Sequence, residues 1–146
     1  MLNGIDVLSV VHTKEKLEMR GGKVKKVRHQ PELEEQAALI EWGAKTVIDS
    51  NRIGDYLIHI PNERKRGPKA ARDAKLLGLR DGVPDLFLAL PRNGYAGLWI
   101  EMKSITGIAT LEPIDWMSKL QNKGYSVVLS HSFSIVKDSV MKYMEK

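Results

Sequence analysis

The chain has 146 residues, a length typical of one domain, and roughly 70% of its unfolded surface can be buried in a single core. Its composition, 42% hydrophobic and 28% charged, excludes a disordered tail, a fibrous repeat and a membrane protein. The longest apolar run, Val83 to Leu90, contains Pro84 and Asp85 and is far shorter than the ~20 residues that span a bilayer. The N-terminus does not resemble a signal peptide, and the chain has no cysteine. We therefore expect a cytoplasmic protein without a membrane partner.

Positive charge is concentrated in two parts of the sequence. Lys and Arg number 23 against 18 Asp and Glu, which gives a net charge of +5 and a pI near 9.4. Residues 14–29 and residues 59–80 each hold seven Lys or Arg and two acidic residues. Two basic segments in a small domain fit contact with a phosphate backbone, but solvated loops and helix faces explain them equally well.

The first half of the chain predicts an arm, a helix and a strand. Residues 1–30 form a basic N-terminal arm, in which Leu8, Val10 and Val11 are a candidate short strand and Gly21–Gly22 open a loosely structured stretch. A helix should begin at Pro31, carry acidic residues in its first turn, and end at Gly43. Residues 46–60 predict a strand with an irregular lead-in, followed by a basic loop.

The second half predicts a mixed sheet. A helix over residues 69–79 is followed by strands at Pro84–Leu90 and Leu98–Lys103, and Asn93–Gly94 between them signals a hairpin. A helix over residues 111–122, with Pro113 in its first turn, a strand over 125–129 and a helix over 132–144 complete the chain. Because a helix connects the last two strands, they can pair in parallel. We expect an α/β sandwich with a mixed central sheet flanked by helices.

The predicted hairpin brings acidic residues together. Asp85 begins its first strand, and Glu101 and Lys103 lie on one side near the end of the second. Antiparallel pairing can place Asp85 beside Glu101, while the Met102 side chain points to the other face and its carbonyl oxygen stays available. Two carboxylates and an ammonium suit metal-dependent phosphodiester hydrolysis, because Mg²⁺ prefers oxygen ligands. An aspartate that caps a turn beside a cross-strand Glu101–Lys103 ion pair explains the same pattern about as well.

These residues resemble a known family signature. Pro84–Asp85 followed by Glu101-Met102-Lys103 resembles the PD-(D/E)xK nuclease motif, and residues 82–86 with 98–103 resemble the VRR-NUC domain of small phage and bacterial nucleases. Glu32 with Gln36, the segment His59–Glu63, and Trp116, Leu120 and Gly124–Tyr125 resemble further parts of that domain in the expected order. The resemblance covers about residues 31–129 and implies a nuclease domain over residues 31–146 with a restriction-endonuclease-like core.

The resemblance also implies a set of site residues. Asp85, Glu101 and the Met102 carbonyl would hold Mg²⁺ or Mn²⁺, and Glu32 would reach the ion directly or through water. Lys103 would be the catalytic lysine. Glu35 and Gln36 are further candidates, although the acidic residues near Glu32 also suit a helix N-terminus. The residues expected to approach DNA phosphates are Asn62, Arg64, Lys65 and Arg66, for which a solvated charge run is the alternative. Pro113 stands where the family commonly has a Gln.

The resemblance finally implies a DNA endonuclease that acts as a homodimer and is selective for branched DNA such as Holliday junctions. A nucleic-acid-binding module without catalysis is the first alternative, and a nuclease for flaps, nicks or single strands is the second. The four histidines are scattered without zinc-ligand spacing, and we expect His59 to be a packed side chain.

Overall fold

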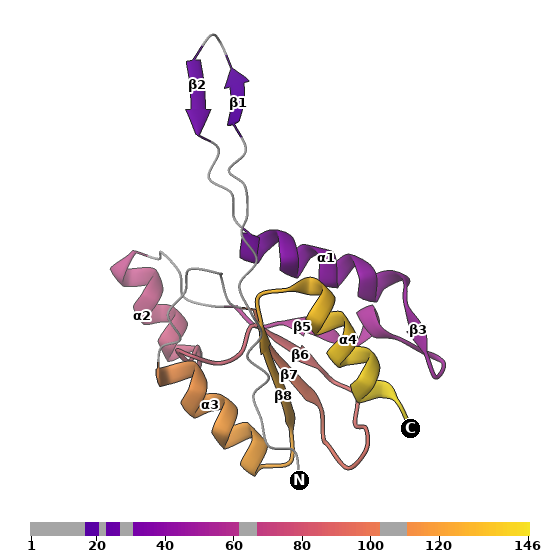
Figure 1. Cartoon of the computed structure of the whole chain (residues 1–146). Helices are drawn as coiled ribbons and strands as arrows, with labels where there is room; N and C mark the ends of the chain where they lie inside the picture. Colours follow the sequence, from indigo (N-terminus) through magenta and orange to yellow (C-terminus); the bar gives the residue numbers. More distant parts are fainter. Residues whose placement is uncertain (1–16, 21–22, 27–30, 62–66, 103–110) are drawn as a thin grey trace.

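A four-stranded sheet forms the centre of the protein. The structure is a computed structural model that describes residues 17–20, 23–26, 31–61, 67–102 and 111–146. The sheet runs in the order β5 (Leu57–His59), β6 (Leu86–Leu88), β7 (Leu98–Met102) and β8 (Ser126–Ser130), as Figure 1 shows. The first three strands are antiparallel neighbours, and β8 pairs in parallel with β7. The predicted mixed sheet is confirmed, and helix α3 (Leu111–Asn122) makes the crossover that a parallel pair requires.

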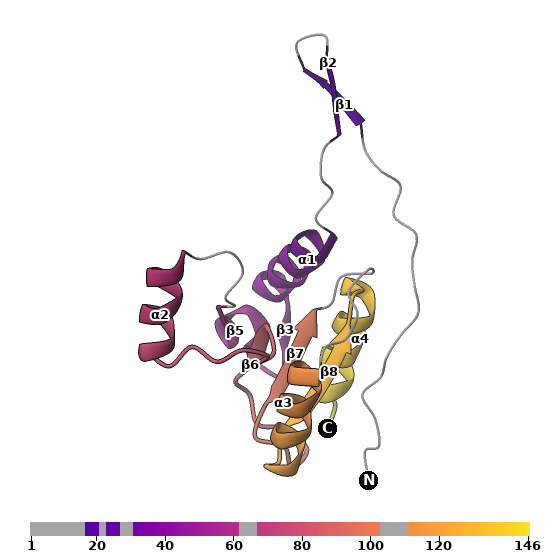
Figure 2. The same ribbon diagram turned by 90° about the vertical axis from the view of Figure 1, so that its left-hand side faces the viewer.

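Helices cover both faces of the sheet. On one face, α1 (Pro31–Lys45) and α4 (Phe133–Met144) pack on the larger core cluster, while α3 packs on the opposite face (Figures 1 and 2). Successive strand residues alternate between the two faces. Residues of the larger core include Leu39, Leu86, Leu88, Leu98, Ile100, Met102, Val128, Val136 and Val140. The smaller core contains Met117, Val127 and Leu129, packed with Trp99.

The β6–β7 hairpin forms where Asn93–Gly94 predicts it. Both residues have positive φ, 49° and 84°, which is the conformation that a two-residue hairpin turn requires. Arg92 and Tyr95 bracket the turn, each donating its backbone N–H to the carbonyl of the other. Phe87 stacks on Trp99 across the ladder with ring centroids 4.5 Å apart, which helps to fix the register. The hairpin therefore sets which residues face each other at the far ends of the two strands.

The lead-in to β5 is irregular, as predicted. A short hairpin of β3 (Val47–Ile48) and β4 (Asn51–Arg52) and a 3-10 turn (Ile53–Asp55) connect α1 to β5. Gly54 lies so close to α1 that a Cβ atom there would be 2.8 Å from the Cα of Ala44. A glycine is therefore required at this contact.

Helix α2 (Pro68–Leu76) lies between β5 and β6 in the chain. Pro68 occupies the start of the helix, where its missing N–H costs nothing. The helix ends at Leu76, three residues before the end that the sequence predicts, and Gly78 follows with a positive φ of 99°. Among the described residues, no helix is long and apolar enough to cross a membrane.

The expectation that Gly21–Gly22 open a loosely structured stretch is wrong for residues 23–26, which form a strand together with residues 17–20. They form an antiparallel pair, β1 (Leu17–Arg20) and β2 (Lys23–Lys26), with Leu17 opposite Lys26. The intervening sequence is Gly-Gly, which is favoured in two-residue hairpin loops, and that signal outweighs the charge of the flanking residues. The candidate strand at Leu8, Val10 and Val11 lies outside the described residues.

Candidate active site

Two buried carboxylates lie at one end of the β6–β7 ladder. Leu86 pairs with Ile100, and continuing this register by one residue places Asp85 opposite Glu101. Each residue is only 5% exposed. Because side chains alternate along a strand, both lie on the sheet face that carries Phe87 and Trp99. The antiparallel hairpin thus brings together two acidic residues that are 16 positions apart in the sequence.

Backbone hydrogen bonds hold Asp85 from both neighbouring strands. The Met102 N–H donates to the Asp85 carboxylate at 3.0 Å, and the Ile60 N–H donates to the Asp85 carbonyl at 2.7 Å. A hydrogen bond to an ionised carboxylate is stronger than one between neutral groups. The Met102 side chain is 1% exposed and belongs to the larger core, so it points away from the acidic face, as the strand alternation predicts.

His59 connects α1 to this end of the sheet. Its Nδ1 lies 3.1 Å from the Asp85 carbonyl oxygen and 3.1 Å from Nε2 of Gln36. One ring nitrogen either donates or accepts, so the tautomer decides which of the two contacts is a hydrogen bond. The expectation of a packed histidine is wrong, because His59 is exposed. The sequence analysis missed this role, although the position of His59 two residues before Pro61 could have indicated it.

Glu35 contacts helix α4 rather than the paired acids. Its carboxylate accepts the N–H of Phe133 at 2.5 Å, at the first residue of α4. The first turn of α4 has no acidic residue of its own, so Glu35 supplies negative charge at the positive end of that helix. For Glu32 the structure describes the backbone in the first turn of α1 and not the side chain. Its predicted role in metal binding stays a prediction.

Comparison with solved structures shows similarity in fold. No family model matches the sequence, and no curated protein matches it. A solved structure described as a "VRR_NUC domain protein" superposes with a TM-score of 0.67 and 26% sequence identity, and the match covers 80% of this chain and 90% of that one. Over most of its length the chain is therefore similar to a VRR-NUC domain protein in both fold and sequence. Its α/β architecture, with a mixed four-stranded sheet between helices, is that of the restriction-endonuclease-like fold.

Several predicted site residues lie outside the described residues. They are Asn62, Arg64, Lys65, Arg66 and Lys103. Within the described part of the chain, no cluster of three or more acidic or histidine side chains could hold a metal ion. Asp85 and Glu101 still fit a magnesium-type ion, because such an ion often takes only one or two carboxylates and completes its shell with water and substrate phosphate.

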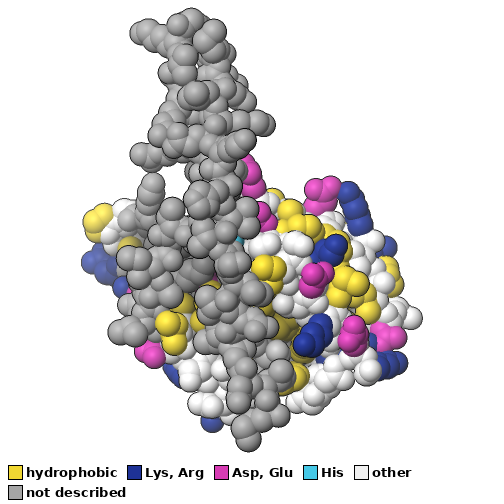
Figure 3. Space-filling view, viewed as in Figure 1, with side chains coloured by type: hydrophobic (Ala, Val, Ile, Leu, Met, Phe, Trp, Pro, Cys, Tyr) yellow, Lys and Arg dark blue, Asp and Glu magenta, His cyan; other side chains and the backbone are white. Residues whose placement is uncertain are grey.

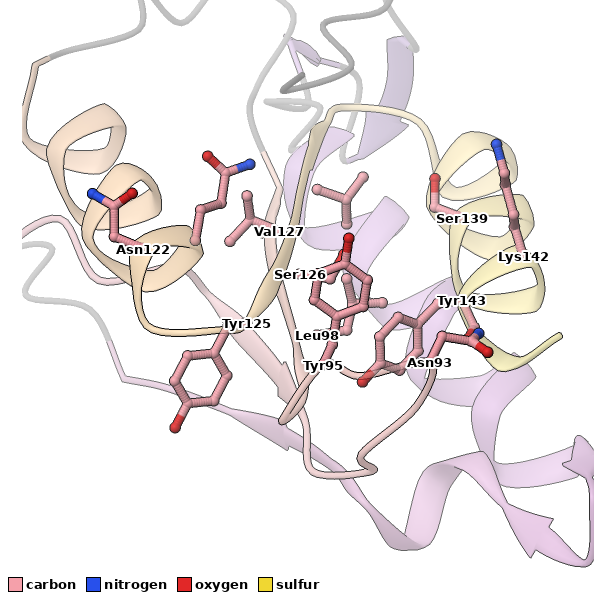
Figure 4. A pocket seen from close by; sticks show the side chains of 12 residues that line it. Asn93, Tyr95, Leu98, Asn122, Tyr125, Ser126, Val127, Ser139, Lys142 and Tyr143 are labelled. Atoms are coloured by element: carbon pink, nitrogen blue, oxygen red, sulfur yellow. The ribbon is translucent and has the colours of Figure 1, made fainter. Parts of the chain in front are cut away.

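A pocket of about 550 Å³ lies at the opposite end of the central sheet. Figure 4 shows it between α3 and α4, beside the first residues of β8. Its lining includes Leu98 and Ser126, at the starts of β7 and β8, and Tyr143, whose hydroxyl donates to the Leu90 carbonyl at 2.6 Å. Burial raises the pKa of Tyr143, so the phenol keeps its proton at neutral pH. Asp85 and Glu101 do not line this pocket, so it is not the site of the paired acids.

Proposed function

We propose that this chain is a divalent-metal-dependent DNA endonuclease that is selective for branched DNA, such as Holliday junctions, and acts as a homodimer. The observation that carries the proposal is the pair of buried carboxylates, Asp85 and Glu101, at facing positions of an antiparallel ladder. Two carboxylates from neighbouring strands are an oxygen donor set of the kind that Mg²⁺ takes in proteins, with water and substrate phosphate completing its shell. The similarity to a VRR_NUC domain protein supports a nuclease.

The residues have separate roles in this proposal. Asp85 and Glu101 would hold Mg²⁺ or Mn²⁺, with the Met102 carbonyl oxygen and Glu32 as further ligands, the latter directly or through water. The bound ion would polarise the scissile phosphate and lower the pKa of an attacking water. Lys103 would orient that water or stabilise the charge that develops on the phosphate. The hydrogen bond from Met102 N–H fixes the Asp85 carboxylate before any ion binds, which supports its place in this set.

Positive charge and symmetry support a DNA substrate. The chain carries a net charge of +5, and Asn62, Arg64, Lys65 and Arg66 would contact phosphates beside the paired acids. A twofold homodimer would present two such sites and could cut two strands of a branched substrate. We place this activity in the cytoplasm of a bacterial or phage-infected cell.

The test is cleavage of end-labelled DNA by the full chain with Mg²⁺ or Mn²⁺. A four-way junction, a flap, a nicked duplex and a linear duplex are compared under identical conditions. We expect paired cuts in the junction and little cleavage of the linear duplex. Asp85→Asn, Glu101→Gln and Lys103→Ala should each lose cleavage and keep DNA binding, while Asp138→Asn, an exposed acid on α4, should behave as the wild type.

Other outcomes separate the alternatives. Salt-sensitive DNA binding without any cleavage, in either metal, would show a nucleic-acid-binding module and contradict the enzyme. Preferential cutting of flaps, nicks or single strands would keep the nuclease and contradict the junction preference. A chain that sediments as a monomer while cutting both strands of a junction would contradict the homodimer.

A further inference from the structure

Two exposed leucines lie at the C-terminal end of helix α2: Leu76 is its last residue and Leu77 follows directly. Leu76 is 79% exposed and Leu77 is 89% exposed, although leucine is a residue type most often buried in folded proteins. The only buried residue of α2 is Ala74, so the helix packs weakly on the rest of the domain. A helix of nine residues is too short to be stable alone in water. The exposed face of α2 could therefore be stabilised by contacts with a binding partner.

Basic side chains surround these leucines. On a helical projection Leu76 falls between Arg72 and Lys69, and Lys75 borders the same face. All three basic side chains are exposed, and a hollow of about 450 Å³ on this helix is lined by Arg72, Lys75 and Leu76 among others. Figure 3 shows dark blue and yellow side chains together at the left edge of the molecule, where α2 lies.

The basic side chains on this face outnumber the acidic ones near it, so its net charge is positive. Asp73 lies on α2, and Asp81 forms an ion pair with Lys75 at 3.7 Å. Within the described part of the chain, neither Lys69 nor Arg72 forms an ion pair, so both are available to an anionic partner. An apolar pair bordered by cations matches a ligand that combines phosphates with flat apolar surfaces, which is the chemistry of unstacked bases in DNA.

The chain connects α2 to the paired acids. The Ile60 N–H donates to the Asp85 carbonyl, so the segment that carries α2 leaves the sheet and returns to it beside Asp85. Leu77 precedes Asp85 by eight residues, which limits their separation to roughly 28 Å. A single turn of duplex DNA, about 34 Å long, could therefore contact α2 and the paired acids together.

We propose that α2 is a DNA-binding wedge, in which Leu76 and Leu77 contact unstacked bases at a branch point while Lys69 and Arg72 bind the flanking phosphates. This inference rests on the proposed nuclease function for its choice of ligand. Apolar wedges that enter base steps are used by other DNA-binding proteins, and a branch point has already paid part of the unstacking cost. Contacts between the wedge and unstacked bases would make the enzyme bind branched DNA more tightly than linear DNA.

The test measures binding in metal-free buffer, so that cleavage does not contribute. Full-length wild type and Leu76→Ala/Leu77→Ala are titrated by fluorescence anisotropy onto a four-way junction and onto a linear duplex of equal length. Val47→Ala/Met141→Ala, which removes two other exposed apolar side chains, is the matched control. We expect the leucine double variant to bind the junction roughly tenfold more weakly than wild type, because burying one leucine side chain changes the binding constant by about this factor. Its Kd for the duplex should stay within twofold of the wild-type value. The control variant should match the wild type on both ligands.

Two further measurements test the parts separately. Lys69→Ala/Arg72→Ala should weaken binding to both ligands, and the slope of log Kd against log salt should fall by about 1.8. With 2-aminopurine at the branch point, the wild type should raise fluorescence and the leucine variant should not. Because all four side chains are exposed, circular dichroism and Tm should stay unchanged in both variants.

The results that would refute the wedge differ from those that would refute the nuclease function. If the leucine variant binds the junction as tightly as wild type, the wedge is refuted, whether or not the wild type cleaves DNA. If wild type sediments as a dimer and the leucine variant as a monomer, the leucines contact a second copy and the DNA assignment is overturned. Intact junction binding with no cleavage in any metal would refute the nuclease and leave the wedge supported.

Discussion

Replacing Asp85 with Asn should abolish the response of this protein to divalent metal ions. The amide has nearly the same shape as the carboxylate, and its oxygen can still accept the Met102 N–H, so the fold should survive. What the variant removes is one of two negative charges at facing strand positions. The wild type can therefore offer a bound cation both carboxylates, and the variant offers it only one.

The expected size of the effect follows from linkage between binding and unfolding. At a Mn²⁺ concentration ten times the Kd, binding to the folded state stabilises it by about 1.4 kcal/mol. For a chain of 146 residues, with an unfolding entropy of about 2.1 cal/mol/K per residue, this raises Tm by about 4–5 °C. In Asp85→Asn the rise should fall below about 1 °C, and cleavage should fall by roughly a thousandfold.

The assay is thermal unfolding followed by circular dichroism across a Mn²⁺ titration, with Asp138→Asn as the control that removes an exposed acid elsewhere. Glu101→Gln should reproduce the loss seen in Asp85→Asn, because the ion needs both carboxylates. A Tm rise of wild-type size in Asp85→Asn would refute the reasoning, since the ion would then bind without the paired acids.

Three further predictions test the fold around the site. Gly54→Ala should destabilise the protein by about 1–3 kcal/mol in urea unfolding, because its Cβ would overlap the backbone of α1. Gly67→Ala, with open space around it, should be nearly neutral. Equal losses of stability in the two variants would contradict the close contact at Gly54. Glu35→Ala should cost about 1 kcal/mol through the lost N-terminal cap of α4, and Glu35→Gln should recover part of it; an unchanged urea midpoint in Glu35→Ala would contradict the cap. Arg92 lowers the pKa of Asp49 through a side-chain hydrogen bond, so Asp49 stabilises the fold above its unfolded pKa and this contribution is lost as the pH falls through the lower folded pKa. Asp49→Asn should therefore be less stable than wild type at pH 7, and the gap in Tm should close in strong acid; a gap independent of pH would contradict the interaction.

Local signals were enough to predict the elements that build the site. The Asn93–Gly94 turn predicted the hairpin, and the alternation of apolar residues on its two strands predicted which side chains share a face. Together they bring Asp85 opposite Glu101, because the turn and the pleat fix the register of an antiparallel pair. The order of motifs from Pro31 onward also predicted the restriction-endonuclease-like fold. The glycine pair at residues 21–22 carried a hairpin signal of the same kind, which the charge of its neighbours obscured.

The amino-acid sequence alone predicted the strands of the central sheet, the four helices and the pairing of the two acids, since each depends on neighbours a few residues away or on one tight turn. Only the tertiary structure decided that Glu35 caps a helix 98 residues later and that His59 lies between Gln36 and Asp85. It also decided that α2 exposes its leucines, which an apolar pair at the end of a helix would not suggest. These features depend on how whole elements pack against one another, and no periodicity within a single segment encodes that arrangement.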